Sequence, residues 1–179
     1  GLQKDEQWLE KISMEAFKKQ SELTMPMIEE LFIKYNINPQ DLDEVVLTQG
    51  PGSYTGIRIS MTIAKVLGAI GKVRVYTLNT LEAMIGLVKQ PTGALIDARS
   101  KRVYMSIVDG HGIVCEPCVA TIDALHEIKN VHWVGDTQLI GVDSQPIDLI
   151  QNMYDLKNQW NFVENVHQLV PLYLKESND

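Results

Sequence analysis

The run from Gly50 to Arg58 carries the residue types best suited to bind a ligand. It reads Gly-Pro-Gly-Ser-Tyr-Thr-Gly-Ile-Arg, follows an apolar strand pattern and opens a long helix pattern. Glycines at a tight strand-to-helix turn allow positive φ, and such a turn can direct the free amides of a helix start at an anion. The spacing matches neither the dinucleotide-binding fingerprint nor the phosphate-binding P-loop, so a purely structural turn is at least as well supported.

Two further groups could do chemistry, but each also has a simpler structural role. Ser53 and Thr55 could act as nucleophiles, yet the sequence places no general base beside them, and both suit helix capping. Asp97 and Arg99 flank Ala98, so an extended strand points both side chains to the same face. They form either an ion pair or a catalytic acid with a group that tunes it. A structural pair in a cleft is favoured, because no second carboxylate is marked.

Cys115 and Cys118 have the C-x-x-C spacing of redox and zinc sites. A thioredoxin-like pair should stand at the start of a helix after a core strand, whereas the next helix pattern begins only near residue 121. A zinc site needs two more ligands, and His126 and His132 follow at shorter spacing than in zinc fingers. Two ordinary reduced thiols are therefore favoured, and the sequence predicts no metal site.

A βαβ unit must position the glycine-rich turn. Residues 44–48 read as a strand, 56–70 as a helix and 73–77 as a second strand, which predicts parallel strands joined by a right-handed crossover. Further strands are predicted at 7–14, 94–98, 102–108 and 131–134, and from the turn at 109–112 to Cys115. Further helices are predicted at 20–35, 79–88, 121–128 and 146–156.

Composition and charge exclude some classes of function. The 179 residues are 45% hydrophobic and 22% charged, as in soluble globular proteins, and no apolar run reaches the length of a membrane helix. Because no signal peptide is visible, a cytoplasmic location is the default expectation. The formal net charge of −7 argues against a protein that binds RNA through its own broad surface.

As a whole string, the run at 50–58 resembles the signature of the TsaB (YeaZ) family, the scaffold subunit of bacterial tRNA threonylcarbamoyladenosine synthesis. The residues of this motif turn are Gly50, Pro51, Gly52, Ser53, Gly56 and Arg58. Segments 42–45, 79–83, 95–99 with 103–104, and 171–175 are also similar to family segments, so the resemblance spans about residues 7 to 175.

The resemblance implies an α/β fold of the actin-like (ASKHA, ribonuclease H-like) type with two lobes. Residues 1–91 would form the N-terminal lobe and 92–165 the C-terminal lobe, and residues after about 165 would return to the first. The family usually opens with an apolar strand and an Asp-Thr-Ser-like turn, followed by a second strand. Neither precedes Gly1, so the first lobe is expected to be incomplete at its N-terminus.

The resemblance also implies a non-catalytic subunit that binds the enzyme TsaD in threonylcarbamoylation of tRNA adenosine 37. Where TsaD carries two metal-binding histidines and a Ser-Gly-Gly phosphate turn, this sequence has Thr80, Met84 and Asp97-Ala98-Arg99. No cofactor is expected in this chain, and ATP and metal are expected on partner subunits. The implied partners are TsaD, TsaE through the TsaB–TsaD complex, a second copy when alone, and tRNA only within the complex. The alternative is a free-standing enzyme of the same fold, either a nucleotide-binding phosphotransferase or an M22-type metallopeptidase.

The helices at 20–35 and 56–70 carry more apolar residues than one sheet face can cover. Internal packing and a helix-bundle interface explain this excess equally well, and the resemblance points to these helices for both homodimer and heterodimer. Met61 and Ile28 are expected to face outward. The interface candidates are Ile28, Leu31, Phe32, Ile57, Met61, Ala64, Lys65 and Gly68.

Overall fold

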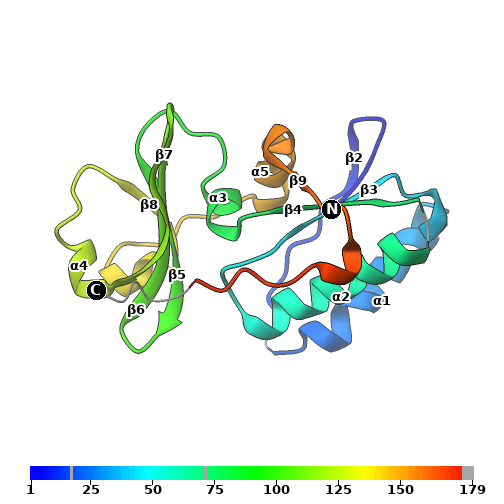
Figure 1. Ribbon diagram of the computed structural model, residues 1–179, viewed down its shortest axis with the longest axis horizontal. Coiled ribbons are helices and arrows are strands. Elements are labelled where there is room, and N and C mark those ends of the chain that lie inside the picture. Colours follow the sequence, from blue (N-terminus) through cyan, green and yellow to red (C-terminus); the bar gives the residue numbers. More distant parts are fainter. Residues whose placement is uncertain (17, 71, 175–179) are drawn as a thin grey trace.

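The chain folds into two groups of strands with helices beside and between them (Figure 1). The computed structural model describes residues 1–16, 18–70 and 72–174. The strands of the first lobe form a three-stranded sheet and a separate two-stranded sheet, and those of the second lobe form one four-stranded sheet. No helix in the described part of the chain combines the length and apolar character needed to cross a membrane.

The predicted βαβ unit forms the centre of the first lobe. Its elements are β3 (Glu44–Thr48), α2 (Tyr54–Ile70) and β4 (Arg74–Leu78). β3 and β4 are parallel, with Val45 opposite Val75, and β9 (Asn161–Phe162) pairs antiparallel with the other side of β4. The core between sheet and helix consists of Leu47, Ile57, Met61, Ala64, Val75 and Leu169.

The two-stranded sheet is a hairpin of β1 (Leu2–Lys4) and β2 (Gln7–Glu10). The predicted strand at 7–14 is thus too long, since residues 11–14 pair with no strand. Helices, and not sheet pairing, hold the hairpin in place. Trp8 Nε1 donates to Gln151 Oε1 at 3.0 Å, and on the α1 side the Tyr35 hydroxyl donates to the carbonyl of Leu9 at 2.8 Å.

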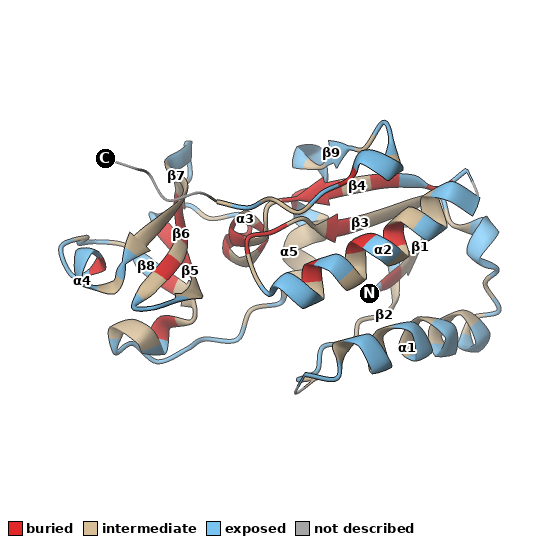
Figure 2. Ribbon diagram, turned by 60° about the horizontal axis from the view of Figure 1, so that its bottom comes forward, coloured by how far each residue is buried: buried red, intermediate tan, exposed pale blue. Residues whose placement is uncertain are grey.

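Helix α1 (Gln20–Lys34) contains no buried residue along its whole length (Figure 2). Pro26 lies inside it, in the second turn. After α1, Asn38 caps a single 3₁₀ turn, η1 (Pro39–Asp41), in a capping box with Asp41. The chain then enters β3 directly.

The second lobe is a sheet in the order β7-β6-β5-β8, with β5 and β8 parallel and the other pairs antiparallel. Its strands are β5 (Thr92–Arg99), β6 (Arg102–Asp109), β7 (Gly112–Thr121) and β8 (His132–Gly135). Two short helical segments complete it, α4 (Ile122–Leu125) and η2 (Thr137–Ile140). The predicted strand end at Cys115 and the predicted helix to 128 are wrong, because β7 continues to Thr121 and α4 ends at Leu125.

Helix α3 (Thr80–Ile85) lies between the lobes and packs on both. Its Leu81 and Ile85 contact β5, while Ala83 contacts α5 (Leu149–Asp155). The chain returns to the first lobe before the expected residue 165, because α5 packs under β4 and β9 pairs with it. The last elements of this return are η3 (Lys157–Gln159) and η4 (Val166–Gln168).

We predict that Gly50→Ala destabilises the fold much more than Gly112→Ala. Both glycines have positive φ, +115° and +138°, so both substitutions carry the backbone penalty of about 1–3 kcal/mol. At Gly50 a Cβ would also lie 2.8 Å from the carbonyl oxygen of Leu172, whereas at Gly112 it meets no atom within 4 Å. Urea unfolding of the two variants measures the difference, and equal losses would contradict the close approach at Gly50.

Candidate functional site

The glycine-rich turn is built from backbone contacts among three segments of the chain. The N–H of Gln49 donates to the carbonyl of Leu78 at 3.0 Å, and the N–H of Thr80 donates to the carbonyl of Gly50 at 2.9 Å. From the C-terminal segment, the N–H of Leu172 donates to the carbonyl of Gln49 at 2.8 Å. The turn therefore joins β3 to the start of α3 and to residues more than a hundred positions later.

Side chains of the turn serve the start of α2. Ser53 Oγ accepts a hydrogen bond from the N–H of Gly56 at 3.3 Å, and the carbonyl of Ser53 accepts from the N–H of Ile57 at 3.0 Å. Ser53 thus caps the helix, as its position before the helix indicated. Arg58 points back along the helix, with its guanidinium 5.1 Å from the ring centre of Tyr54.

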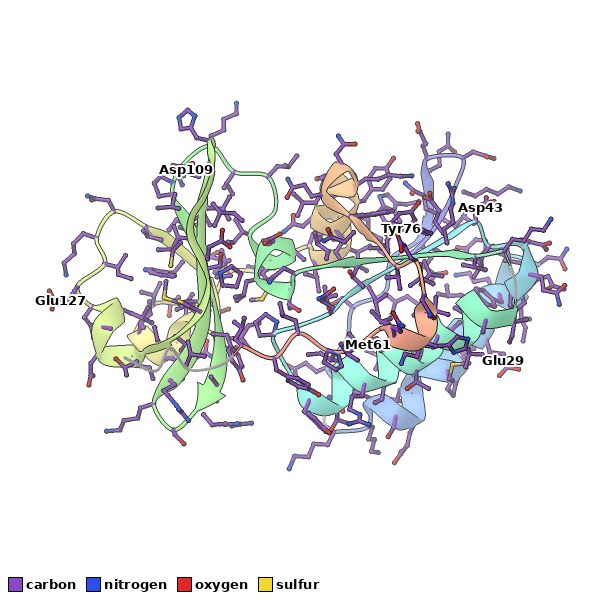
Figure 3. The ribbon with its side chains drawn as sticks, in the orientation of Figure 1. Glu29, Asp43, Met61, Tyr76, Asp109 and Glu127 are labelled. Carbon is purple, nitrogen blue, oxygen red and sulfur yellow. The ribbon has the colours of Figure 1, made fainter. Side chains whose placement is uncertain are left out.

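The predicted outward face of α2 is wrong at Met61. Met61 is 3% exposed and packs in the core against the sheet, together with Ile57 and Ala64 (Figure 3). Lys65 Nζ donates to the carbonyl of His167 at 3.2 Å, and a Cβ on Gly68 would lie 2.8 Å from Val166. These five interface candidates are therefore covered by the sheet or by η4 of the same chain.

The candidates on α1 are only half-buried, and different residues carry the exposed apolar surface. Ile28, Leu31 and Phe32 lie on the side of α1 that is intermediate in exposure. The exposed apolar side chains of the two helices are Met25, Ile33, Tyr54, Val66 and Ile70. None of them is among the predicted interface residues. On α2 the reason is that the helix is apolar on more than one side, so the pattern alone does not mark its outer face.

Asp97 and Arg99 form a surface pair at the end of β5. Arg99 Nη1 lies 3.2 Å from Asp97 Oδ2, and the N–H of Arg99 donates to Asp97 Oδ1 at 2.8 Å. A second carboxylate, which the sequence did not mark, stands beside them: Asp136 Oδ2 accepts from the N–H of Asp97 at 2.7 Å. The position of Asp136 directly after β8 could have indicated this contact. β8 is the parallel neighbour of β5, so both strands end at the same edge of the sheet.

The residues that stand where TsaD has metal-binding histidines have structural contacts. The N–H of Thr80 bonds to the carbonyl of Gly50, and Met84 packs in the core between α3 and the second sheet. Across residues 1–16, 18–70 and 72–174, no three side chains of His, Cys, Asp or Glu are placed to hold a metal ion. Neither a hydroxyl nor a thioether in these positions is a ligand of the usual kind for iron or zinc.

A β-bulge brings the two cysteines to one face of β7. Met105 is opposite Cys118 and Ile107 is opposite Cys115, so three steps along β7 match two steps along β6. Both thiols are free and pack against the core of the second lobe. Burial, and then the neighbouring Cys115, raise the pKa of Cys118 to about 11. A protonated thiol at neutral pH is the opposite of what redox catalysis needs.

Glu82 is a half-buried carboxylate on α3, in the segment that resembles a family signature. Burial raises its pKa, and the carboxylate of Glu116 raises it further. The helix that carries Glu82 begins at the N-cap Asn79, whose side chain accepts from the N–H of Leu81 at 2.8 Å. The ionised form of Glu82 therefore weakens the fold at neutral pH.

Comparisons with known proteins agree with this architecture. The family model described as TsaD, tRNA N6-adenosine threonylcarbamoyltransferase, matches residues 14–132. The tRNA threonylcarbamoyladenosine biosynthesis protein TsaB of Bacillus subtilis is 33% identical over 93 residues, which are 50% of this chain and 41% of that protein. The protein TsaB of Buchnera aphidicola is 24% identical over 181 residues, 94% of this chain and 80% of that protein.

The chain belongs to the TsaB (YeaZ) group of the TsaD family. Two solved structures support its fold: an uncharacterized protein from Pseudomonas aeruginosa similar to peptidase YeaZ, and YeaZ from the same organism. The TM-scores are 0.68 and 0.67 at 17% identity, over 87% of this chain and 84% and 85% of those chains. The two-lobed actin-like fold expected of a TsaB protein is thus confirmed.

We predict that Glu82→Gln raises the melting temperature at pH 7 and leaves it unchanged near pH 3. Because the pKa of Glu82 is raised on folding, ionised Glu82 costs stability once the pH passes the unfolded value of about 4.3, and the cost is absent below it. Calorimetry at both pH values measures this. The control is Glu29→Gln on the exposed face of α1, which should change neither value (Figure 3). A gain that persists at pH 3 would contradict the role of the charge.

We predict that Cys118 reacts with iodoacetamide about 20- to 30-fold more slowly than a free cysteine at pH 7. The pKa of Cys118 is near 11 and that of a free cysteine is about 8.5, so Cys118 has about 300-fold less thiolate at pH 7. The thiolate of higher pKa is a stronger nucleophile, which recovers about tenfold of the lost rate. The rate should keep rising as the pH approaches 11. Mass spectrometry of the folded protein follows each thiol separately, and rapid labelling of Cys118 at pH 7 would contradict its half-buried, protonated state.

Proposed function

We propose that this chain is a non-catalytic subunit that binds a TsaD enzyme and supports threonylcarbamoylation of tRNA adenosine 37. One observation carries the proposal: α1 and α2 leave apolar side chains exposed, in a chain whose relatives are named for tRNA threonylcarbamoyladenosine biosynthesis. Exposed apolar patches of this kind usually mark protein interaction sites.

Helix α1 gives the strongest support for an interface. A helix of 15 residues with no buried residue gains little from packing within its own chain. Ile33 is 73% exposed at its C-terminal end, and on α2 Ile70 is 62% and Val66 is 50% exposed. A partner that covers these side chains would supply the burial that the chain itself does not.

The residues near the glycine-rich turn support a role without chemistry. Ser53 is engaged as a helix cap, Thr80 and Met84 offer no usual metal ligand, and Asp97 is paired with Arg99 on the surface. In this proposal TsaD binds the metal and catalyses the reaction, and partner subunits bind ATP. The chain itself needs no cofactor.

The same helices would serve both partners of the chain. A second copy would cover the exposed apolar face when the chain is alone, and TsaD would replace it. TsaE would join through the TsaB–TsaD complex, and tRNA would bind to the complex as a whole. We place this activity in the cytoplasm, where tRNA is available.

The test is reconstitution with the TsaD and TsaE proteins of the same organism. Purified components, tRNA, ATP, threonine and bicarbonate, with the enzyme that makes the activated threonylcarbamoyl donor, are assayed for modified adenosine with and without this chain. Modification that requires the chain and survives substitution of Asp97 supports a scaffold. Turnover of ATP or peptide by the chain alone, abolished by that substitution, would overturn it.

We predict that Ile33→Glu and Val66→Glu each weaken binding to TsaD at least about tenfold without lowering the melting temperature. Both side chains are at least half exposed, so a charge costs nothing in the free chain but costs several kcal/mol when desolvated in an interface. Ile113→Glu is the matched control, because Ile113 is 47% exposed on the second lobe. Titration by calorimetry or surface plasmon resonance measures the constants. Unchanged affinity in both helix variants would show that this face is free in the complex.

A further inference from the structure

Two tyrosine rings from distant parts of the chain lie together on the surface beside the glycine-rich turn. Tyr54 opens α2, and Tyr173 belongs to the C-terminal segment that runs past it (Figure 1). Their ring centres are 6.2 Å apart with an interplanar angle of 24°, and each residue is 58% exposed. The hydrogen bond from Leu172 to Gln49 fixes the C-terminal segment in this position.

A guanidinium group completes the cluster. The Arg58 carbon Cζ lies 5.1 Å from the ring centre of Tyr54, and its Nη1 donates to the Tyr54 hydroxyl. Arg58 is itself exposed, so its remaining donors face solvent. Aromatic faces with a stacked guanidinium are the groups with which proteins hold unpaired nucleobases and their phosphates.

The surroundings of the rings are polar and lack carboxylates on α2. The side chains that flank Tyr54, Ser53 and Thr55, are exposed and polar, and the 17 residues of α2 include Arg58 and Lys65 but no acid. Tyr and Arg are also enriched in protein hot spots, so the test includes a protein partner as a second arm.

We propose that Tyr54, Tyr173 and Arg58 form a stacking platform for an unpaired nucleobase of RNA. The inference rests on the proposed function and adds to it a direct contact between this chain and a single-stranded part of the tRNA. Stacking needs one ring face and one nearby cation, and so it is compatible with the net charge of −7 that disfavours a broad RNA surface.

The test is binding of two fluorescent RNAs to the full chain at low salt, followed by anisotropy. One is a hairpin with a loop of about seven unpaired nucleotides, and the other is a blunt duplex of equal length. The wild type should bind the hairpin at least about fivefold more tightly than the duplex. Tyr173→Ala should weaken hairpin binding roughly 5- to 100-fold, while Tyr173→Phe stays within about twofold. Phe162→Ala, which removes an aromatic residue that is 56% exposed on β9, should have no effect.

Three results would overturn the platform: no hairpin binding up to about 1 mM, equal affinity for hairpin and duplex, or unchanged affinity in both Tyr173→Ala and Arg58→Gln. Binding of the same variants to TsaD separates this proposal from the first. If Tyr173→Ala loses TsaD but keeps the hairpin, the rings are a protein contact and the platform is refuted, although the proposed scaffold stands. If the wild type fails to bind TsaD, the scaffold fails whatever the hairpin result.

Discussion

The close backbone approach at Gly50 is the constraint on which the first lobe depends. Three backbone hydrogen bonds, of 3.0, 2.9 and 2.8 Å, converge on Gln49 and Gly50 from the end of β4, the start of α3 and the C-terminal segment. The Leu172 carbonyl oxygen occupies the space that a side chain at residue 50 would need. This junction sets where α2 starts, keeps α3 between the lobes and brings Tyr173 beside Tyr54. The primary role of the glycine turn is therefore structural.

Local patterns predicted the elements near this junction well. The bounds of β3 agree with the strand at 44–48, since an apolar run lies there between polar Asp43 and the glycine turn. The helix start predicted at residue 79 is also local, because the Asn79 side chain accepts from the N–H of Leu81 two residues later. The contact between Asp97 and Arg99 does not come from simple strand alternation, because β5 has a register irregularity between the two residues and Arg99 has a φ of +68°.

Features that depend on distant partners could not be predicted. Met61 is buried in the same cluster as Leu169, which lies more than a hundred residues later in the chain. The periodicity of α2 alone cannot predict a contact with so distant a residue. Asp136 reaches Asp97 only through the parallel pairing of β5 and β8. The bulge opposite Met105 that brings Cys115 and Cys118 to one face arises from a register that only the assembled sheet defines. Helix α2 therefore has one face in the core and one face outside, and only the fold distinguishes them.

The division of the first lobe into two sheets has a consequence for how the chain behaves in concentrated solution. Within the described residues, β3 pairs on one side only and β1 pairs only with β2, while the side-chain amide nitrogen of Gln3 is buried without a partner. A row of unpaired N–H and C=O groups is a template for any extended polypeptide. Like the edge strands β7, β8 and β9, these two strands are therefore places where the isolated chain would recruit a foreign strand. Aggregation of the chain during refolding should depend on how quickly these strand edges are covered by other parts of the chain or by a partner.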